Sequence, residues 1–202
     1  MGAVCMGISK IYISKIFSRI LNKMQIANIT ATATLSNSKL NLRHIASLFP
    51  NCTLSTKAFK ALKIKAENGT TGLLYESGKI VLVGGKCLTM TLNAVNDICE
   101  CLNNFASLRG DFFVKDFSVQ NIVGAATFYP IDLGLLYANQ AQNCCYDQEN
   151  FAPALKFKLR KNERPIALIF HTGKVIITGT RTCEEINELY YYLKRMLLRY
   201  KK

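Results

Sequence analysis

The sequence has few of the residues that build catalytic or metal centres. Only two histidines occur in its 202 residues, His44 and His171. Of the eight cysteines none forms a Cys-x-x-Cys pair, and the nearest neighbours are adjacent or one residue apart, which is poor spacing for zinc. A nucleophile elbow, a phosphate-binding glycine loop and paired metal ligands are also missing. The sequence therefore predicts no enzyme, no metal site and no cofactor.

Long hydrophobic runs are missing as well. The Ile- and Phe-rich stretch 8–24 is interrupted by four basic residues, so it falls short of the roughly 18 apolar residues of a membrane span. It is also too broken for a secretory signal. No membrane is expected as a partner, and residues 1–25 are interpreted as a basic, loosely amphipathic helical extension that packs on the protein, a partner or a lipid surface. Without a secretory segment, the cysteines are expected to be reduced and mostly buried.

Acidic residues are scarce relative to basic ones. There are 13 Asp and Glu against 26 Lys and Arg, which gives a formal net charge of +13. Half of the residues are apolar, so the chain can bury a sizeable core and is not expected to be disordered. The surplus of positive charge favours a polyanionic partner, either nucleic acid or an anionic membrane surface, over a generic basic protein.

The sequence does contain an internal duplication. "IANITATATL" at 26–35 resembles "VQNIVGAATF" at 119–128, and "GLLYESGKIVLVGGK" at 72–86 resembles "ALIFHTGKVIITGTR" at 167–181. Between them, "AFKALKIK" at 58–65 resembles "PALKFKLR" at 153–160. Three matches in the same order predict two repeats, at 26–112 and 113–202.

Each half has the same pattern of strands and helices. An opening strand, a short helix, three strands and a long amphipathic helix are expected in this order. Gly78 and Gly173 fall in turns where a positive φ is expected. A further strand is predicted at Phe112–Ser118, leading into the second half. The pattern favours an antiparallel sheet with two long helices on one face.

The strands are apolar at consecutive positions, as in "KIVLVGG" and "KVIITGT", so both faces of the sheet are expected to be apolar. A parallel sheet buried on both sides is the alternative, but the short turns disfavour it because parallel strands need long crossovers. An open apolar face edged with lysines is then a binding surface.

The strings "NIVGAATF", "YDQENFAPALKFKLRK" and "IFHTGKVIITG", with "NITATATLSNSKLNLRHIA" and "YESGKIVLVGGK", resemble the core of the TATA-box-binding protein family. The resemblance covers about residues 26–202. It implies an α+β fold with a pseudo-symmetric tandem repeat, in which helices cover the convex face of a curved, antiparallel, ten-stranded saddle sheet. It also implies that the concave face binds the DNA minor groove and wedges aromatic side chains between base steps.

The resemblance assigns roles by position. The wedge positions match Phe59, Tyr75, Phe151 and Phe170, with Ala152 as the alternative to Phe151 because the second repeat has an extra residue there. The central asparagines match Asn28 and Asn121, and amides suit the acceptors of A·T pairs. Thr178 keeps one hydroxyl of a threonine pair whose other member is Val83. The remaining floor positions match Val81, Ile176, Leu73 and Leu168.

Phosphate contacts are expected at the edges of the sheet, where they would position DNA without reading its sequence. The matching residues are Lys65, Lys79, Lys86, Lys158, Lys174, Arg181, Ser77 and Thr172. A contact resembling that for transcription factor IIB falls on Tyr146, Asp147 and Glu149. The helix at 88–105, a docking site for regulators that is basic in the family, has no basic residue here, so partner binding there is expected to be altered or absent. A IIA-like factor is a further partner that the resemblance implies.

The resemblance implies a transcription initiation factor that bends promoter DNA and recruits the RNA polymerase machinery in the nucleus, or in a viral factory if the source is a virus. A scaffold with weak TATA recognition, acting through partner proteins, is the alternative, which Tyr75, Val83 and the ambiguity at Phe151 favour. Self-association of the open face without DNA is a further expectation.

Overall fold

One antiparallel sheet organises the chain. The computed structural model describes residues 24–49, 52–55, 60–105, 108, 111–146 and 154–202. Their ten strands pair in the order β2-β3-β4-β5-β1-β6-β10-β9-β8-β7. The two halves of this order mirror each other about the β1–β6 pair, as the duplication predicted.

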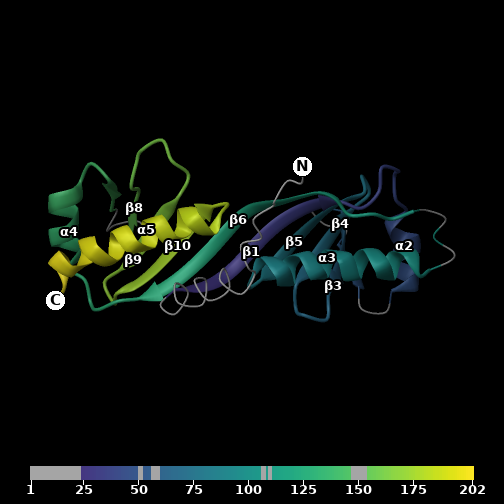
Figure 1. Ribbon diagram of the computed structural model, residues 1–202, viewed down its shortest axis with the longest axis horizontal. Helices are drawn as coiled ribbons and strands as arrows, with labels where there is room; N and C mark the ends of the chain where they lie inside the picture. The colour runs from purple at the N-terminus through teal and green to yellow at the C-terminus, as the bar shows by residue number, and fades with distance from the viewer. Residues whose placement is uncertain (1–23, 50–51, 56–59, 106–107, 109–110, 147–153) are drawn as a thin grey trace, which may run out of the picture.

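The strands of the first repeat are β1 (Gln25–Thr34), β2 (Cys52–Ser55), β3 (Ala61–Lys65), β4 (Thr71–Tyr75) and β5 (Lys79–Gly85). Those of the second are β6 (Lys115–Thr127), β7 (Cys144–Cys145), β8 (Ala154–Phe157), β9 (Ile166–Phe170) and β10 (Lys174–Thr180). The helices are α2 (Leu42–Leu48), α3 (Leu88–Asn103), α4 (Leu133–Gln140) and α5 (Cys183–Met196), with a 3₁₀ turn at Leu197–Tyr200. Figure 1 shows α3 and α5 lying end to end along one face of the sheet, with α2 and α4 at its two ends.

Two details of the strand prediction are wrong. Phe112–Ser118 is not a separate strand, because its last four residues begin β6, which continues without a break to Thr127. The ten strands include instead the short β2 and β7. The match of 58–65 with 153–160 is also displaced by two residues, because Ala61 lies opposite Tyr75 as Ala154 lies opposite Phe170.

Two glycines hold the turns that precede β5 and β10. Gly78 has φ +80° and Gly173 has φ +86°, so both have the positive φ that was predicted. A Cβ atom would lie 2.0 Å from the Ser36 carbonyl oxygen at Gly78 and 2.2 Å from the Tyr129 oxygen at Gly173. Both the backbone conformation and the close approach of the neighbouring chain therefore require glycine.

Each long helix covers its own hydrophobic core. Val95, Ile98 and Leu102 of α3 pack on the first half of the sheet, and the apolar face of α5 packs on the second. The long strands pass between the cores: Ile29 of β1 lies in the core of the second repeat, whereas Ala31 and Ala33 lie in that of the first. β6 crosses in the opposite direction, because Phe117 packs against the first core and Ile122 lies in the second.

Seven of the cysteines lie in the described part of the chain, and all seven are free thiols. Cys99 is buried, but Cys87, Cys101 and Cys145 are exposed, so the expectation that most are buried is wrong. Burial raises the pKa of the Cys144 thiol to about 11. Among the described helices, none has the length and hydrophobicity needed to cross a bilayer.

Candidate nucleic-acid interface

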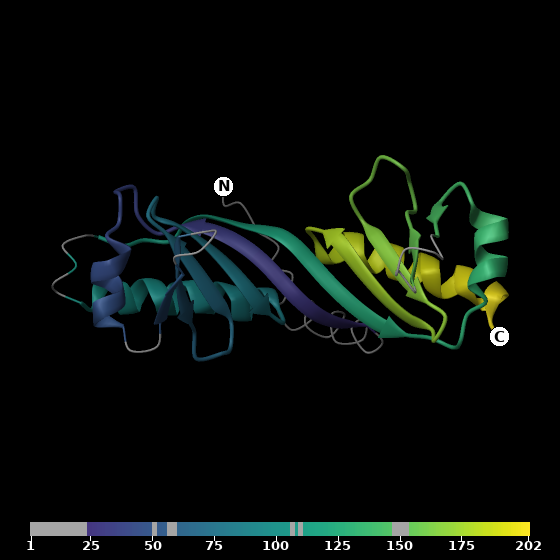
Figure 2. The same ribbon diagram turned by 180° about the vertical axis from the view of Figure 1, so that it is seen from behind.

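Within the described residues, α3 and α5 lie on one face of the sheet only, and Figure 2 shows the molecule from the opposite side. Along β5, Ile80 and Leu82 are buried toward α3, whereas Val81 and Val83 are only half-buried on the other face. β4, β9 and β10 alternate in the same way. We call this second surface the open face. The floor residues assigned from the sequence are all half-buried and all fall on the open face by this alternation: Asn28, Asn121, Thr178, Val81, Ile176, Leu73 and Leu168.

The two asparagines occupy equivalent places at the centre of the open face. The Asn28 side-chain oxygen accepts a hydrogen bond of 2.7 Å from the backbone N–H of Gly84, and that of Asn121 accepts one of 2.9 Å from Gly179. Both glycines have positive φ, where β5 and β10 bulge against β1 and β6. The bulges thus fix both amides with the oxygen toward the backbone and the NH₂ group as the remaining donor.

The NH₂ groups of the two amides have different partners. The Asn121 Nδ2 donates to the Thr178 hydroxyl at 3.2 Å, across β6 and β10. The equivalent of Thr178 in β5 is Val83, which has no hydroxyl, and the Asn28 Nδ2 donates instead to Thr30 in its own strand at 3.1 Å. Each NH₂ has a second hydrogen that can donate to an acceptor above the sheet.

Two of the four wedge candidates can be placed. Tyr75 ends β4 and Phe170 ends β9; both are half-buried on the open face, each opposite an alanine of the next strand. Phe59 and Phe151 lie outside the described residues. The equivalence of Ala61 and Ala154 nevertheless pairs position 59 with position 152 in the sequence, which favours Ala152 over Phe151 as the counterpart of Phe59.

Basic side chains edge the open face. Lys65, Lys79, Lys174 and Arg181 are exposed, as are Ser77 and Thr172 in the turns. Lys86 donates through Nζ to the Ala27 carbonyl, and the half-buried Lys158 donates to the Lys161 carbonyl at 3.4 Å. None of these lysine and arginine side chains forms an ion pair within the described part of the chain.

Residues of the open face were also missed from the sequence. Lys63 and Lys156 are exposed and occupy equivalent positions in β3 and β8. Each lies between two buried apolar residues, a leucine before it and an isoleucine or a phenylalanine after it. Thr30 and Val123 flank the central asparagines. The period-two alternation around Leu62–Ile64 and Leu155–Phe157 is the signal that would have identified both lysines.

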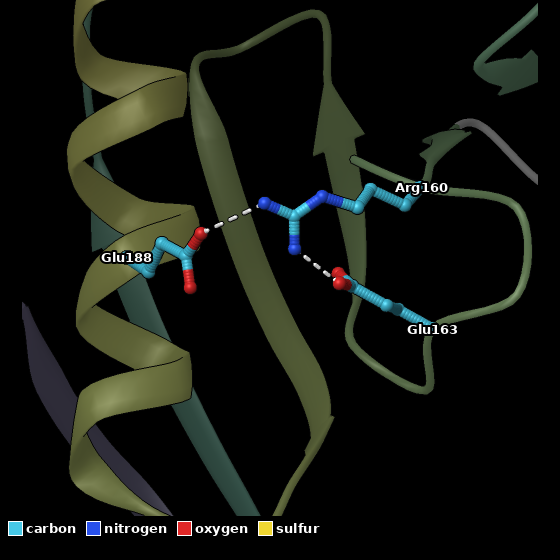
Figure 3. Close-up of polar contacts among 3 residues, drawn as sticks. All are labelled: Arg160, Glu163 and Glu188. Carbon is cyan, nitrogen blue, oxygen red and sulfur yellow. Dashed lines mark hydrogen bonds and ion pairs between the residues drawn. The ribbon is translucent and has the colours of Figure 1, made fainter.

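One basic residue near this edge faces the other way. Arg160 forms ion pairs with Glu163 in its own loop and, at 3.6 Å, with Glu188 of α5 (Figure 3). The hydrogen bond to Glu163 and the charges of both carboxylates raise the pKa of Arg160. Arg160 therefore ties the β8–β9 loop to the helix and is not available on the open face.

The partner-binding candidates can be placed only in part. Tyr146 is half-buried, and its ring centroid lies 6.2 Å from that of Tyr137 on α4. Asp147 and Glu149 lie outside the described residues. Asp97 and Glu100 are exposed on α3, so that helix presents negative charge. Within the described ranges, no three His, Cys, Asp or Glu side chains group into a metal site.

Comparison with known proteins gives a consistent match. The sequence model of "Transcription factor TFIID (or TATA-binding protein, TBP)" matches residues 23–105 and 116–200. The TATA-box-binding protein of Tetrahymena thermophila is 31% identical over 88% of this chain and 71% of its own length. The TATA box-binding protein-like 2 of Rattus norvegicus is 32% identical over 88% of this chain and 51% of its own length, so the chain spans about half of that relative.

The solved structure of Methanococcus jannaschii TBP superposes with a TM-score of 0.69 at 23% identity, covering 87% of this chain and 96% of that one. The saddle architecture and the duplication are thereby confirmed, with helices on one face of a curved ten-stranded sheet. Since the family model matches both repeats, the chain belongs to the TATA-box-binding protein family.

Proposed function

We propose that this chain is a transcription initiation factor that binds promoter DNA in the minor groove through its open face and bends it. The observation that carries the proposal is the pair Asn28 and Asn121, held by equivalent glycines at the centre of an apolar, lysine-edged surface. An amide donor over an apolar floor suits A·T pairs, whose minor groove presents only acceptors.

Bending follows from the placement of the aromatic candidates. Tyr75 and Phe170 lie at the ends of equivalent strands, so they would meet the duplex on opposite sides of the centre. Unstacking a base step by an inserted ring costs a few kcal/mol, which is offset by the contact that a bent duplex makes with a curved sheet.

The proposed partners are promoter DNA and the RNA polymerase machinery, with action in the nucleus. Tyr146, Asp147 and Glu149 are proposed to contact a factor resembling transcription factor IIB. The negative surface of α3, with Asp97 and Glu100, supports altered docking of a IIA-like factor there.

DNA bending measured by energy transfer between the duplex ends tests this function. We expect Phe170→Ala to reduce the bend strongly, whereas Tyr191→Ala, which removes an exposed ring on α5, leaves it unchanged. Bending by Phe170→Ala equal to that of the parent would rule out the wedge role.

A second candidate is a scaffold that acts mainly through partner proteins and recognises TATA weakly. Val83, which removes one hydroxyl from the centre, supports it. A gel-shift titration separates the two candidates: an initiation factor binds a TATA duplex several-fold more tightly than a scrambled one at the same salt concentration, and a scaffold does not.

A further inference from the structure

The centre of the open face has two chemically different halves. We call Val83, Asn28 and Val123 the valine row, and Thr178, Asn121 and Thr30 the threonine row. Each row crosses three strands, β5-β1-β6 in one case and β10-β6-β1 in the other. Thr30 lies opposite Asn121, and Val123 lies opposite Asn28.

The rows are related by the pseudo-twofold axis of the fold. The axis passes through the pair formed by Ile29 and Ile122, which are equivalent residues and lie opposite each other across β1 and β6. Rotation about it places Thr30 on Val123 and Thr178 on Val83. The backbone and the asparagines obey the symmetry, whereas both hydroxyls lie on one side of the axis.

The hydrogen bonds follow this asymmetry. In the threonine row, Asn121 donates to Thr178 across the strands. In the valine row, Asn28 finds no hydroxyl at Val83 and donates to Thr30, a member of the other row. The Thr178 hydroxyl also donates to the Asn121 side-chain oxygen at 3.5 Å. Each threonine hydroxyl oxygen keeps a second lone pair with which it can accept, whereas the valines can neither donate nor accept.

These differences matter for the edges of base pairs. A G·C pair places the guanine N2 amino donor in the minor groove, where A·T and T·A pairs show acceptors only. Against the valine row this amino group loses water and gains no acceptor. Against the threonine row, a hydroxyl oxygen can accept from it.

We propose that the two rows make Thr30 and Thr178 the residues that set the direction of binding: the threonine row takes the G·C-containing half of an asymmetric site and the valine row takes the half that is only A·T. The proposal rests on the proposed minor-groove function and adds to it a polarity for this chain.

The test uses a palindromic A·T duplex and a second duplex in which one pair beside the centre is G·C. A photo-crosslinking side chain replaces His171, which is exposed in the turn after Phe170, and the cross-linked end of the duplex is mapped. The same side chain in place of Glu76, the equivalent position after Tyr75, should mark the opposite end. We expect a preference of about tenfold for one orientation on the G·C duplex, the size of effect that leaving one buried donor unpaired produces.

The matched variant exchanges the rows by four nearly isosteric substitutions: Thr30→Val, Thr178→Val, Val83→Thr and Val123→Thr. We expect it to reverse the orientation on the G·C duplex, scored as the ratio of the two cross-linked ends, which does not depend on the variant's overall affinity. If the fourfold variant does not fold, Thr178→Val with Val83→Thr alone should reduce the preference.

The outcomes separate the two proposals. The protein could bind and bend the palindrome but show equal orientations on the G·C duplex, or an orientation there that the exchange of the rows does not change. Either result would overturn the polarity and leave the proposed function standing. Failure to bind either duplex would overturn the proposed function, and the polarity with it.

Discussion

Phe170 lies opposite Ala154 across β9 and β8, on the open face. Ala61 lies in the same way opposite Tyr75, and both alanines are buried. Ala154→Leu would place a larger side chain against the Phe170 ring and displace it, at an overpacking cost of about 1–3 kcal/mol.

We therefore expect Ala154→Leu to weaken duplex bending even though Phe170 itself is intact. Energy transfer across a labelled duplex measures the bend, and a urea titration establishes that the variant is folded. A folded variant with the parent's bend would show that the position of the ring does not depend on its small neighbour.

The newly identified Lys156 should contact phosphate. Replacing it by glutamine is expected to lower the slope of log K against log salt concentration by about 0.9, the effect of one lost phosphate contact. Arg160→Gln is the matched control, since it removes the same charge from a side chain that faces Glu188 on α5. Equal slopes for the parent and the Lys156 variant would place this lysine outside the interface.

Gly78→Ala tests the turn before β5. The added Cβ would meet the Ser36 carbonyl at 2.0 Å, and the positive φ disfavours alanine as well. We expect a loss of at least about 1–3 kcal/mol in the free energy of unfolding, measured in urea.

Gly134→Ala is its control. Gly134 lies in α4 without a positive φ, and its Cβ would meet nothing nearer than an Asp132 carboxylate oxygen at 3.4 Å. Alanine there should be neutral or stabilise by about 0.5–1 kcal/mol. A comparable loss for both variants would contradict the role assigned to the turn.

The adjacent Cys144 and Cys145 should differ in thiol reactivity. Burial raises the pKa of Cys144 from 9.0 to about 11, so at pH 8 its thiolate fraction is about a hundredfold below that of an unshifted thiol. Iodoacetamide at pH 8 should modify the exposed Cys145 first, as peptide mass analysis would show, and modification of Cys144 should accelerate as the pH rises toward 11. Equal rates at pH 8 would contradict the burial of Cys144.

The fold was largely predictable because the duplication supplied the same pattern twice. The turns at Gly78 and Gly173 and the apolar faces of α3 and α5 followed from it. The alternation of burial in β4, β5, β9 and β10 did not, because these strands are apolar at consecutive positions. β2 and β7 were missed because four and two residues carry too little periodicity to be recognised. The prediction of a separate strand at Phe112–Ser118 was wrong because nothing in the sequence marks Lys115 as the start of one strand that continues to Thr127.

The site was less predictable. Asn28 and Asn121 could be matched from the repeat, but their glycine partners lie on another strand and depend on the register of the bulges. Thr30 escaped notice because its counterpart is Val123, and a search for repeated residue types passes over positions where the repeats differ. Those differences are what give the centre its two unlike rows.

The exchange of β1 and β6 between the two cores has a consequence for folding. Neither repeat holds all the residues of its own core, because the chain of one supplies Ile29 to the other and receives Phe117 in return. In a polypeptide ending at residue 112, Ile29 would have no second core to pack in, and the core beneath α3 would lack Phe117. The two halves should consequently melt as one cooperative unit, and damage to either would be felt by both.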